Sequence, residues 1–155
     1  MPQAITREFI ESFYRARLSR DRAQIEPFID DNVDWLITGP FELLQFCGQR
    51  NGKEEVLDTI VRVMPSIMHV SKVELEAILI EGDRACTFNR LTGVLRGSGR
   101  IISYHQAQFF RFRDGKIVEY RNIIDSFDAA EQMMGHPIAL PTPQLFLEGT
   151  ERVAI

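Results

Sequence analysis

The chain has 155 residues, 45% of them apolar, and a formal net charge of −4. This length and composition predict one globular domain over residues 1–155, and the acidic balance argues against a nucleic-acid partner. No apolar run is long enough for a membrane span, the first five residues do not resemble a signal peptide, and Cys47 and Cys86 lack metal-ligand spacing. We therefore expect a cytoplasmic protein with free thiols and no metal or other cofactor.

Helical periodicity dominates the first 65 residues. Apolar side chains recur every three to four positions over 6–18, which predicts an amphipathic helix. A second, short helix opens near Asp21 and is bent by Pro27. A third follows Asn51-Gly52 and is expected to end at Pro65. The arginines of the first helix and its turn are assigned to the solvated side: Arg15, Arg17, Arg20 and Arg22.

Strand periodicity dominates the rest of the chain. A first strand over 33–37 stops at Gly39-Pro40, whereas residues 41–50 show no clear period. Two long strands follow over 70–80 and 84–96, and two more flank Asp114-Gly115, a strong hairpin signal. A short helix is predicted over 126–134, and residues 135–155, with three prolines, form a C-terminal extension. Apolar residues in this tail suggest that it packs on its own subunit or on a partner.

The Asp114-Gly115 turn determines which side chains share a face of the sheet. A two-residue loop would pair Arg113 with Lys116, and a three-residue loop would pair Phe112 with Lys116. We prefer the second register because it separates aromatic from charged side chains. It places one group on the interior face: Tyr104, Gln106, Gln108, Phe110, Phe112, Val118, Tyr120, Asn122 and Ile124.

Helices followed by a meander of long strands predict an α+β fold. We expect a cone-shaped, curved and mostly antiparallel sheet with three N-terminal helices packed on its concave face. Such a sheet can enclose an apolar cavity between its strands and the helices.

The order of these elements resembles the nuclear-transport-factor-2-like superfamily, in its branch of polyketide cyclases and ketosteroid isomerases. The matching segments are residues 29–35, 51–55 and 110–119, and the likeness spans roughly residues 5–134. The resemblance implies binding of a small apolar molecule in the cone and a homodimer formed through the outer face of the sheet. Fold alone does not establish a reaction.

The catalytic groups of these relatives are not reproduced here. Ketosteroid isomerases use a tyrosine, a carboxylate base and a protonated aspartate, and the corresponding positions hold Phe13, Trp35 and Gln108. A shift of one residue would offer Tyr14 as the tyrosine. Epoxide hydrolases of the superfamily use an arginine between aspartates, and Arg90 with Asn122 departs from that pattern.

The predicted ligand site is polar but uncharged, and suits a neutral oxygen atom. Its residues come from the hairpin, the first helix and neighbouring strands: Phe13, Tyr14, Trp35, Arg90, Gln106, Gln108, Tyr120 and Asn122. The alternatives are that the amides only bond one another in the core, and that Arg90 is a surface residue. We also expect Cys86 to be a buried thiol.

Catalytic activity is uncertain from the sequence. The first hypothesis is a small-molecule-binding protein of the cyclase/isomerase-like group, possessing acid–base chemistry on an apolar, oxygenated substrate. The alternatives are a non-catalytic ligand-binding domain and a dimeric protein-interaction module of the same fold.

Overall fold

Helices occupy the N-terminal part of the chain, as the apolar periodicity predicts. The computed structural model describes residues 3–141. Helix α1 (Arg7–Ser19) starts after Thr6, whose side chain accepts a hydrogen bond from the Phe9 amide at 3.1 Å. The helix ends at Arg20, which adopts a left-handed conformation with φ of 57°. Its buried side carries Ile10, Phe13, Tyr14 and Ala16.

The second and third helical segments are short or composite. Helix α2 (Arg22–Ile25) leads into the 3-10 helix η1 (Glu26–Phe28), where Pro27 sits as predicted. Helix α3 (Lys53–Asp58) continues through the π-helical turn η2 (Thr59–Val63) into α4 (Met64–Ile67). The prediction that Pro65 ends the third helix is therefore wrong. Proline is tolerated here because it occupies the first turn of a new helical segment, where its missing N–H is not needed.

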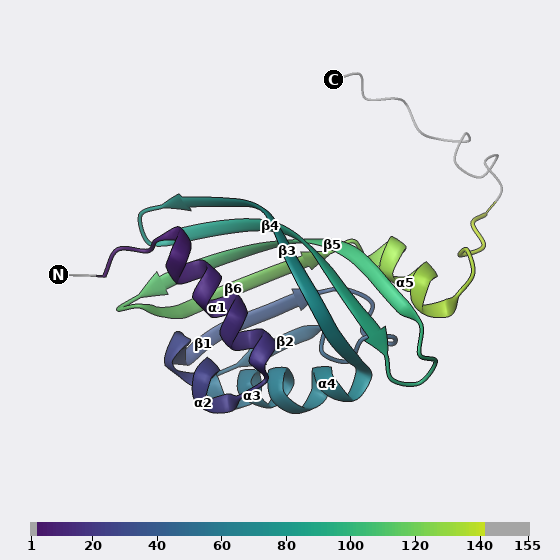
Figure 1. Cartoon of the computed structure of the whole chain (residues 1–155), viewed down its shortest axis with the longest axis horizontal. Coiled ribbons are helices and arrows are strands. Elements are labelled where there is room, and N and C mark those ends of the chain that lie inside the picture. Colours follow the sequence, from purple (N-terminus) through teal and green to yellow (C-terminus); the bar gives the residue numbers. More distant parts are fainter. Residues whose placement is uncertain (1–2, 142–155) are drawn as a thin grey trace, which may run out of the picture.

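Six strands form one mixed, mostly antiparallel sheet in the order β2-β1-β6-β5-β4-β3 (Figure 1). The strands are β1 (Ile29–Thr38), β2 (Gly48–Asn51), β3 (Met68–Glu81), β4 (Arg84–Leu95), β5 (Ile101–Arg113) and β6 (Lys116–Ile124). The β1–β6 pair is parallel, and the other pairs are antiparallel. Helix α5 (Ser126–Met134) follows β6, as predicted, and packs on β5. Strand β2 was not predicted, because this edge strand is short and polar and has no apolar periodicity.

The predicted register of the β5–β6 hairpin is wrong, although its division of faces is right. Asp114 and Gly115 form a two-residue turn with φ of 51° and 71°, and Arg113 pairs with Lys116. A bulge then shifts the pairing between Arg111 and Phe112. Because a bulge adds one residue to one strand, it restores the parity that the two-residue turn had changed. Gln108 consequently lies opposite Asn122, on the same interior face.

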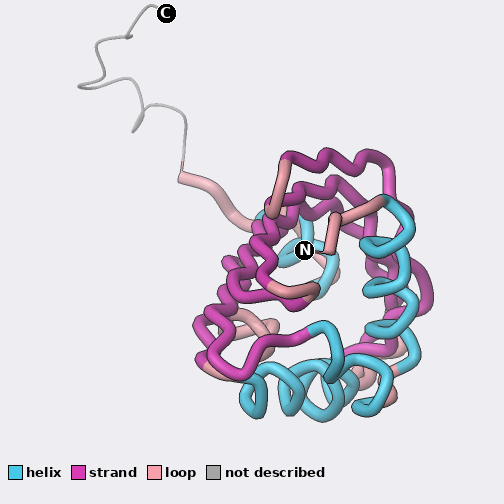
Figure 2. Tube along the Cα trace, turned by 90° about the vertical axis from the view of Figure 1, so that its left-hand side faces the viewer, coloured by secondary structure: helices cyan, strands magenta, loops and turns pink. Residues whose placement is uncertain are grey.

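The core lies between the inner face of the sheet and the helices, which face each other across the interior in Figure 2. Large aromatic side chains fill it: Phe13, Trp35, Tyr104, Phe110 and Tyr120 are at most 1% exposed. The outer face is more open, with Phe88 43% and Ile123 63% exposed. Cys86 is exposed too, contrary to prediction, because its strand parity points it outward. The cone-like curvature stays a prediction.

The two remaining predictions concern the C-terminal extension and the absence of a membrane span. Most of the predicted extension, including Leu145 and Phe146, lies outside the described residues, so its packing stays a prediction. Within residues 3–141, no helix is long and apolar enough to cross a membrane.

Candidate functional site

A layer of neutral polar side chains lies on the inner face of β4, β5 and β6. Thr87, Gln108 and Asn122 are neighbours in adjacent strands. Two residues further along β4 and β5, Asn89 pairs with Gln106. All five are at most 4% exposed. Alternation along the strands places them together, because residues two apart share one face of a sheet.

These side chains satisfy most of one another's hydrogen bonds. The Asn122 amide donates to Gln106 Oε1 at 3.0 Å, and Gln106 Nε2 donates to Asn89 Oδ1 at 2.8 Å. Asn89 Nδ2 in turn donates to Gln108 Oε1 at 3.3 Å. Tyr14 donates its hydroxyl hydrogen to the same Gln108 oxygen. The network therefore ties α1 to the centre of the sheet.

Tyr120 connects this network to an aromatic wall. Its ring stacks on Trp35 with centroids 3.6 Å apart and an angle of 16° between the planes. Its hydroxyl oxygen accepts hydrogen bonds from Gln108 Nε2 at 2.6 Å and from the Arg17 guanidinium at 2.8 Å. An aromatic hydroxyl that receives a cationic and a neutral donor is strongly polarised.

Arg17 is the charged group of the site, and its predicted place on the solvated side of α1 is wrong. Its guanidinium carbon lies 5.6 Å from the Trp35 ring centroid and 5.8 Å from that of Tyr120. A second N–H group faces the Met64 sulfur at 4.0 Å. No carboxylate within the described residues forms an ion pair with Arg17. The interior is therefore cationic, not uncharged as predicted.

The ionisation of these groups follows from their surroundings. Burial raises the pKa of Tyr14 and of Tyr104, so both hydroxyls are protonated at neutral pH. Burial also raises the pKa of Tyr120, although the nearby Arg17 charge and the hydrogen bonds oppose it. Burial disfavours the charged form of Arg17, but its interactions with Tyr120 outweigh this and its pKa is raised. Burial raises the pKa of Cys47 to about 12, which leaves no thiolate nucleophile there.

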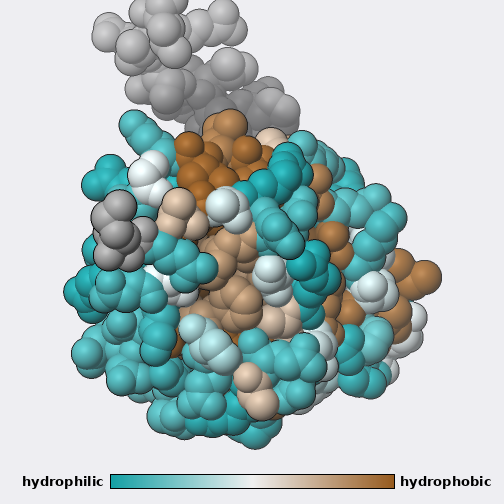
Figure 3. Space-filling model, turned by 60° about the vertical axis from the view of Figure 1, so that its left-hand side comes forward, coloured by the Kyte–Doolittle hydropathy of each residue, from teal (hydrophilic) through white to brown (hydrophobic). Residues whose placement is uncertain are grey.

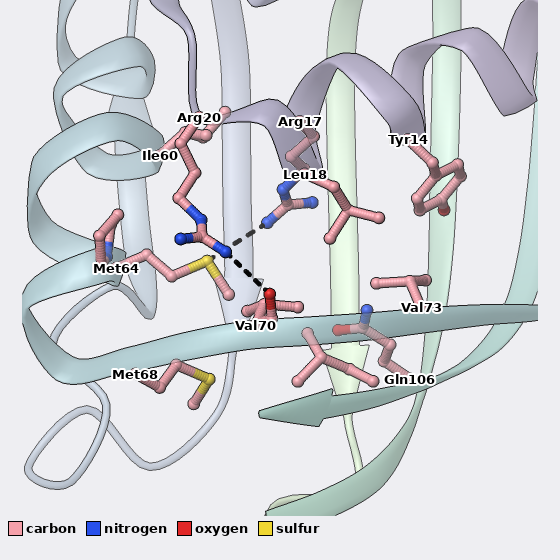
Figure 4. A pocket seen from close by; sticks show the side chains of 12 residues that line it. Tyr14, Arg17, Leu18, Arg20, Ile60, Met64, Met68, Val70, Val73 and Gln106 are labelled. Carbon is pink, nitrogen blue, oxygen red and sulfur yellow. Dashed lines mark hydrogen bonds between the residues drawn. The ribbon is translucent and has the colours of Figure 1, made fainter. Parts of the chain in front are cut away.

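A pocket opens beside Arg17, between the end of α1, the η2–α4 segment and the start of β3 (Figure 4). Apolar side chains and two arginines line most of it: Leu18, Ile60, Met64, Met68, Val70, Val73, Leu91, Arg17 and Arg20. Tyr14 and Gln106 connect the pocket to the polar network, and no carboxylate lines it. The enclosed volume is about 30 Å³, room for one or two water molecules. A larger ligand therefore requires side chains at the opening to move.

Three buried polar atoms in the described part of the chain have no hydrogen-bond partner. They are Trp35 Nε1, the Tyr104 hydroxyl and Asn122 Oδ1. Buried polar groups are normally satisfied, because an unmet donor or acceptor costs about 1–3 kcal/mol. None of these three residues is among the described residues that line the pocket beside Arg17.

Seven of the eight predicted site residues are buried in the interior, but of the eight only Tyr14 and Gln106 line the pocket. Phe13 contacts the ring of Tyr14, and Trp35, Gln106, Gln108, Tyr120 and Asn122 share the interior as described above. Arg90 does not join them, since it lies on the outer face and contacts His105 Nδ1 at 3.1 Å. Residues 3–141 contain no group of three His, Cys, Asp or Glu side chains that could hold a metal.

A second concavity lies at the opposite end of the sheet, between the N-terminal segment and the tips of the β3–β4 and β5–β6 hairpins. Figure 3 shows apolar surface on this side of the molecule, bordered by hydrophilic residues. Ile5, Ile80 and Phe112 contribute to the concavity, and its charged groups are of both signs. Arg113, for example, is already paired with Asp30 at 3.6 Å. This region therefore offers no unpaired charge comparable to Arg17.

Comparisons with known proteins agree with this architecture. A proposed isomerase from Rhodopseudomonas palustris is 29% identical, with a TM-score of 0.78 over 85% of this chain and 100% of that one. A protein of ketosteroid isomerase-like fold from Catenulispora acidiphila, crystallised with trimethylamine, is 15% identical, with a TM-score of 0.71 over 86% and 96%. TerC, crystallised with polyporic acid, is 19% identical, with a TM-score of 0.68 over 82% and 96%.

The last two likenesses show the fold alone. No functionally curated protein matches the chain in sequence. The model of the SnoaL-like domain matches residues 10–120, which include α1 without its first three residues, all six strands except the end of β6, and every site residue except Asn122. The chain therefore belongs to the family of SnoaL-like domains.

Proposed function

We propose that this protein binds a small, largely apolar molecule in the pocket beside α1, and that Arg17 and Tyr120 hold an oxygen atom of that molecule. The observation that carries the proposal is the unpaired guanidinium of Arg17 in a largely apolar interior. A guanidinium has five N–H donors, and within residues 3–141 those of Arg17 have only the Tyr120 hydroxyl and the Met64 sulfur as side-chain partners.

The energetics favour a ligand with an oxygen acceptor. A charge removed from water is costly unless it is paired and hydrogen-bonded, so a ligand oxygen beside Arg17 would replace lost solvation. The apolar body would lie against Ile60, Met64 and Leu91. Binding pockets for small molecules commonly combine a mostly apolar lining with few polar groups that fix orientation.

The same pair of groups would suit isomerase- or cyclase-type chemistry. Arg17 and the polarised Tyr120 hydroxyl would stabilise negative charge developing on a substrate carbonyl oxygen, as an oxyanion hole does. Structural neighbours of the fold include a proposed isomerase, an epoxide hydrolase and a proposed hydroxylase. A non-catalytic binding domain is the second candidate. It is favoured by the absence of any Asp or Glu among the buried polar residues of the described chain.

Trp35 provides a direct test of binding. It is the only tryptophan of the chain, and its ring centroid lies 5.6 Å from the Arg17 guanidinium carbon, so one indole N–H resonance reports on the surroundings of Arg17. We expect benzamide, a small neutral ring with an oxygen acceptor, to shift this resonance saturably, and toluene to bind at least about five times more weakly. Arg17→Met replaces the guanidinium by a thioether and retains an unbranched apolar side chain. It should weaken benzamide binding about tenfold.

The matched control is Arg15→Met, on the exposed side of the same helix. It changes the net charge equally and should leave benzamide binding unchanged. If benzamide produced no saturable shift, or if the two variants bound it alike, the proposal would be wrong.

We also propose a homodimer through the outer face of the sheet, and a cytoplasmic location. Leu79, Phe88 and Ile123 are all more than 40% exposed on this face, and Phe88 stacks on His105 with ring centroids 4.9 Å apart. A two-fold contact would cover these side chains in both subunits. Light scattering at micromolar concentration should give twice the chain mass, and Ile123→Glu should halve it; a monomer before substitution would contradict the proposal.

A further inference from the structure

We infer that the ligand is an anion, a small apolar carboxylate, and that Arg20 is a second, specificity-determining contact for its charge at the pocket opening. This inference rests on the proposed function, because it specifies the ligand of the same pocket. It differs from the expectation drawn from the sequence, which was a neutral oxygen in an uncharged site.

Arg20 is held across the opening of the pocket. It caps the C-terminus of α1, and its guanidinium reaches β3, where it donates to the Val70 carbonyl oxygen at 3.0 Å and contacts His69 Nδ1 at 2.8 Å. It forms no ion pair with a carboxylate of residues 3–141. Figure 4 shows the guanidinium groups of Arg20 and Arg17 entering the pocket region from α1 and its end, on either side of the Met64 thioether.

The charge of the pocket opposes that of the whole chain. The chain carries a formal charge of −4, yet the residues that line the pocket include two arginines and neither an aspartate nor a glutamate. Two cations facing one largely apolar space repel each other, and an anion between them would relieve the repulsion. A neutral carbonyl could accept hydrogen bonds from Arg17, but it would leave both charges uncompensated.

A carboxylate fits this arrangement better than a single oxygen does. Its two oxygen atoms can accept from two guanidinium groups, and charge-assisted bonds of this kind are the strong ones. The Val70 and His69 contacts leave Arg20 with unused N–H donors, because a guanidinium carries five. The remaining lining, with Met64, Met68 and Ile60, suits an aliphatic or aromatic body.

The test compares two ligands of nearly the same shape, benzoate and benzamide, in four proteins, by the Trp35 indole resonance and by calorimetry. We expect the unaltered protein to bind benzoate at least about ten times more tightly than benzamide. Arg20→Gln should weaken benzoate about fivefold and change benzamide by less than about twofold. Arg20→Lys should recover part of the benzoate affinity, and Arg15→Gln should change neither ligand.

The outcomes separate this inference from the proposed function. The inference is wrong if benzamide binds as tightly as benzoate, or if Arg20→Gln has no more effect than Arg15→Gln. Arg20 would then only connect α1 to β3, and the proposed function would stand. If benzamide does not shift the Trp35 resonance, the proposed function fails, and the inference that rests on it fails with it. Circular dichroism of each variant identifies any loss that comes from unfolding.

Discussion

The arginines of the outer sheet face and those of the pocket have opposite surroundings. On the outer face, Arg121 bonds Asp34 at 2.6 Å and lies 3.4 Å from Glu119, which also accepts from Arg111 at 3.0 Å. In the pocket, Arg17 and Arg20 have hydroxyl, sulfur, imidazole and carbonyl partners instead. Arg111 and Arg121 are paired with carboxylates of the sheet, whereas Arg17 and Arg20 have no carboxylate partner within residues 3–141.

This difference separates groups that stabilise the fold from groups available to a ligand. The amides of the inner sheet face belong to the first kind, because Gln106, Gln108 and Asn89 already satisfy one another. The charges available to a ligand come from α1 and its cap. The unpaired charges of the pocket therefore come from the helix and its cap, and the inner face of the sheet beneath them is a support of neutral polar side chains.

Gln108 gives the largest expected effect, because it is the central member of the support. Its oxygen accepts from Tyr14 and Asn89, and its nitrogen donates to Tyr120. Gln108→Met fills a similar volume but removes one hydrogen bond from each of these three buried partner groups, which retain only their bonds to Thr87 or Arg17. We expect the free energy of unfolding, measured by urea denaturation, to fall by about 3 kcal/mol.

Gln45→Met is the matched control, since Gln45 is exposed and donates only to the Glu42 carbonyl oxygen. Its effect should stay below about 0.5 kcal/mol. Equal denaturation midpoints for the two variants would mean that the buried network does not hold the sheet and α1 together.

The fold was largely predictable because apolar periodicity is a redundant signal. The β5–β6 hairpin shows what this signal can and cannot predict. The predicted register was wrong, yet the prediction that Gln108 and Asn122 share a face was right. Alternation of buried residues identifies a face in each strand separately, whereas the register depends on the turn and on the bulge near Val118. The edge strand β2 was missed because four residues with few apolar side chains carry no period.

The site was predictable only in its neutral part. Arg17 follows Phe13 by four residues and Tyr14 by three, so helical geometry already places it on the buried side of α1. Its charge led to an assignment to the solvated side. The spacing could have identified it, whereas the contacts of Arg20 with β3 depend on residues 50 positions away and carry no local signal.

Arg17 gives the next largest effect, and in the opposite direction. Desolvation is the largest single effect of the surroundings on the Arg17 charge, and the Tyr120 hydroxyl that opposes it is uncharged at neutral pH, so removing the guanidinium removes a cost. Arg17→Met also deletes one hydrogen bond to Tyr120, but Gln108 still bonds that hydroxyl. We expect the free energy of unfolding to rise by about 1 kcal/mol while benzamide binding weakens about tenfold, as is common at functional sites. A fall of similar size in urea denaturation would mean that Arg17 mainly stabilises the fold.

The outer face should give the smallest effect, visible mainly in its dependence on pH. Hydrogen bonds from Arg121 and Gln49 hold the pKa of Asp34 below its ordinary value. A carboxyl whose pKa is lowered by folding contributes stability above its ordinary pKa, and the contribution is lost as the pH falls through the folded-state pKa. Because the Asp34 side chain is 48% exposed, solvent screening should keep this contribution below about 0.5 kcal/mol.

Asp34→Asn should therefore lower the urea midpoint slightly at pH 7, and the difference from the unaltered protein should vanish near pH 2, where both side chains are neutral. In an Arg121→Met background the substitution should have a smaller effect at pH 7, because the main partner is gone. An effect of Asp34→Asn that persisted unchanged at low pH would show that the residue acts through packing. In that case the ion pair with Asp34 would not explain how Arg121 contributes to stability. The contrast between paired outer arginines and unpaired pocket arginines would then be weaker than their contacts indicate.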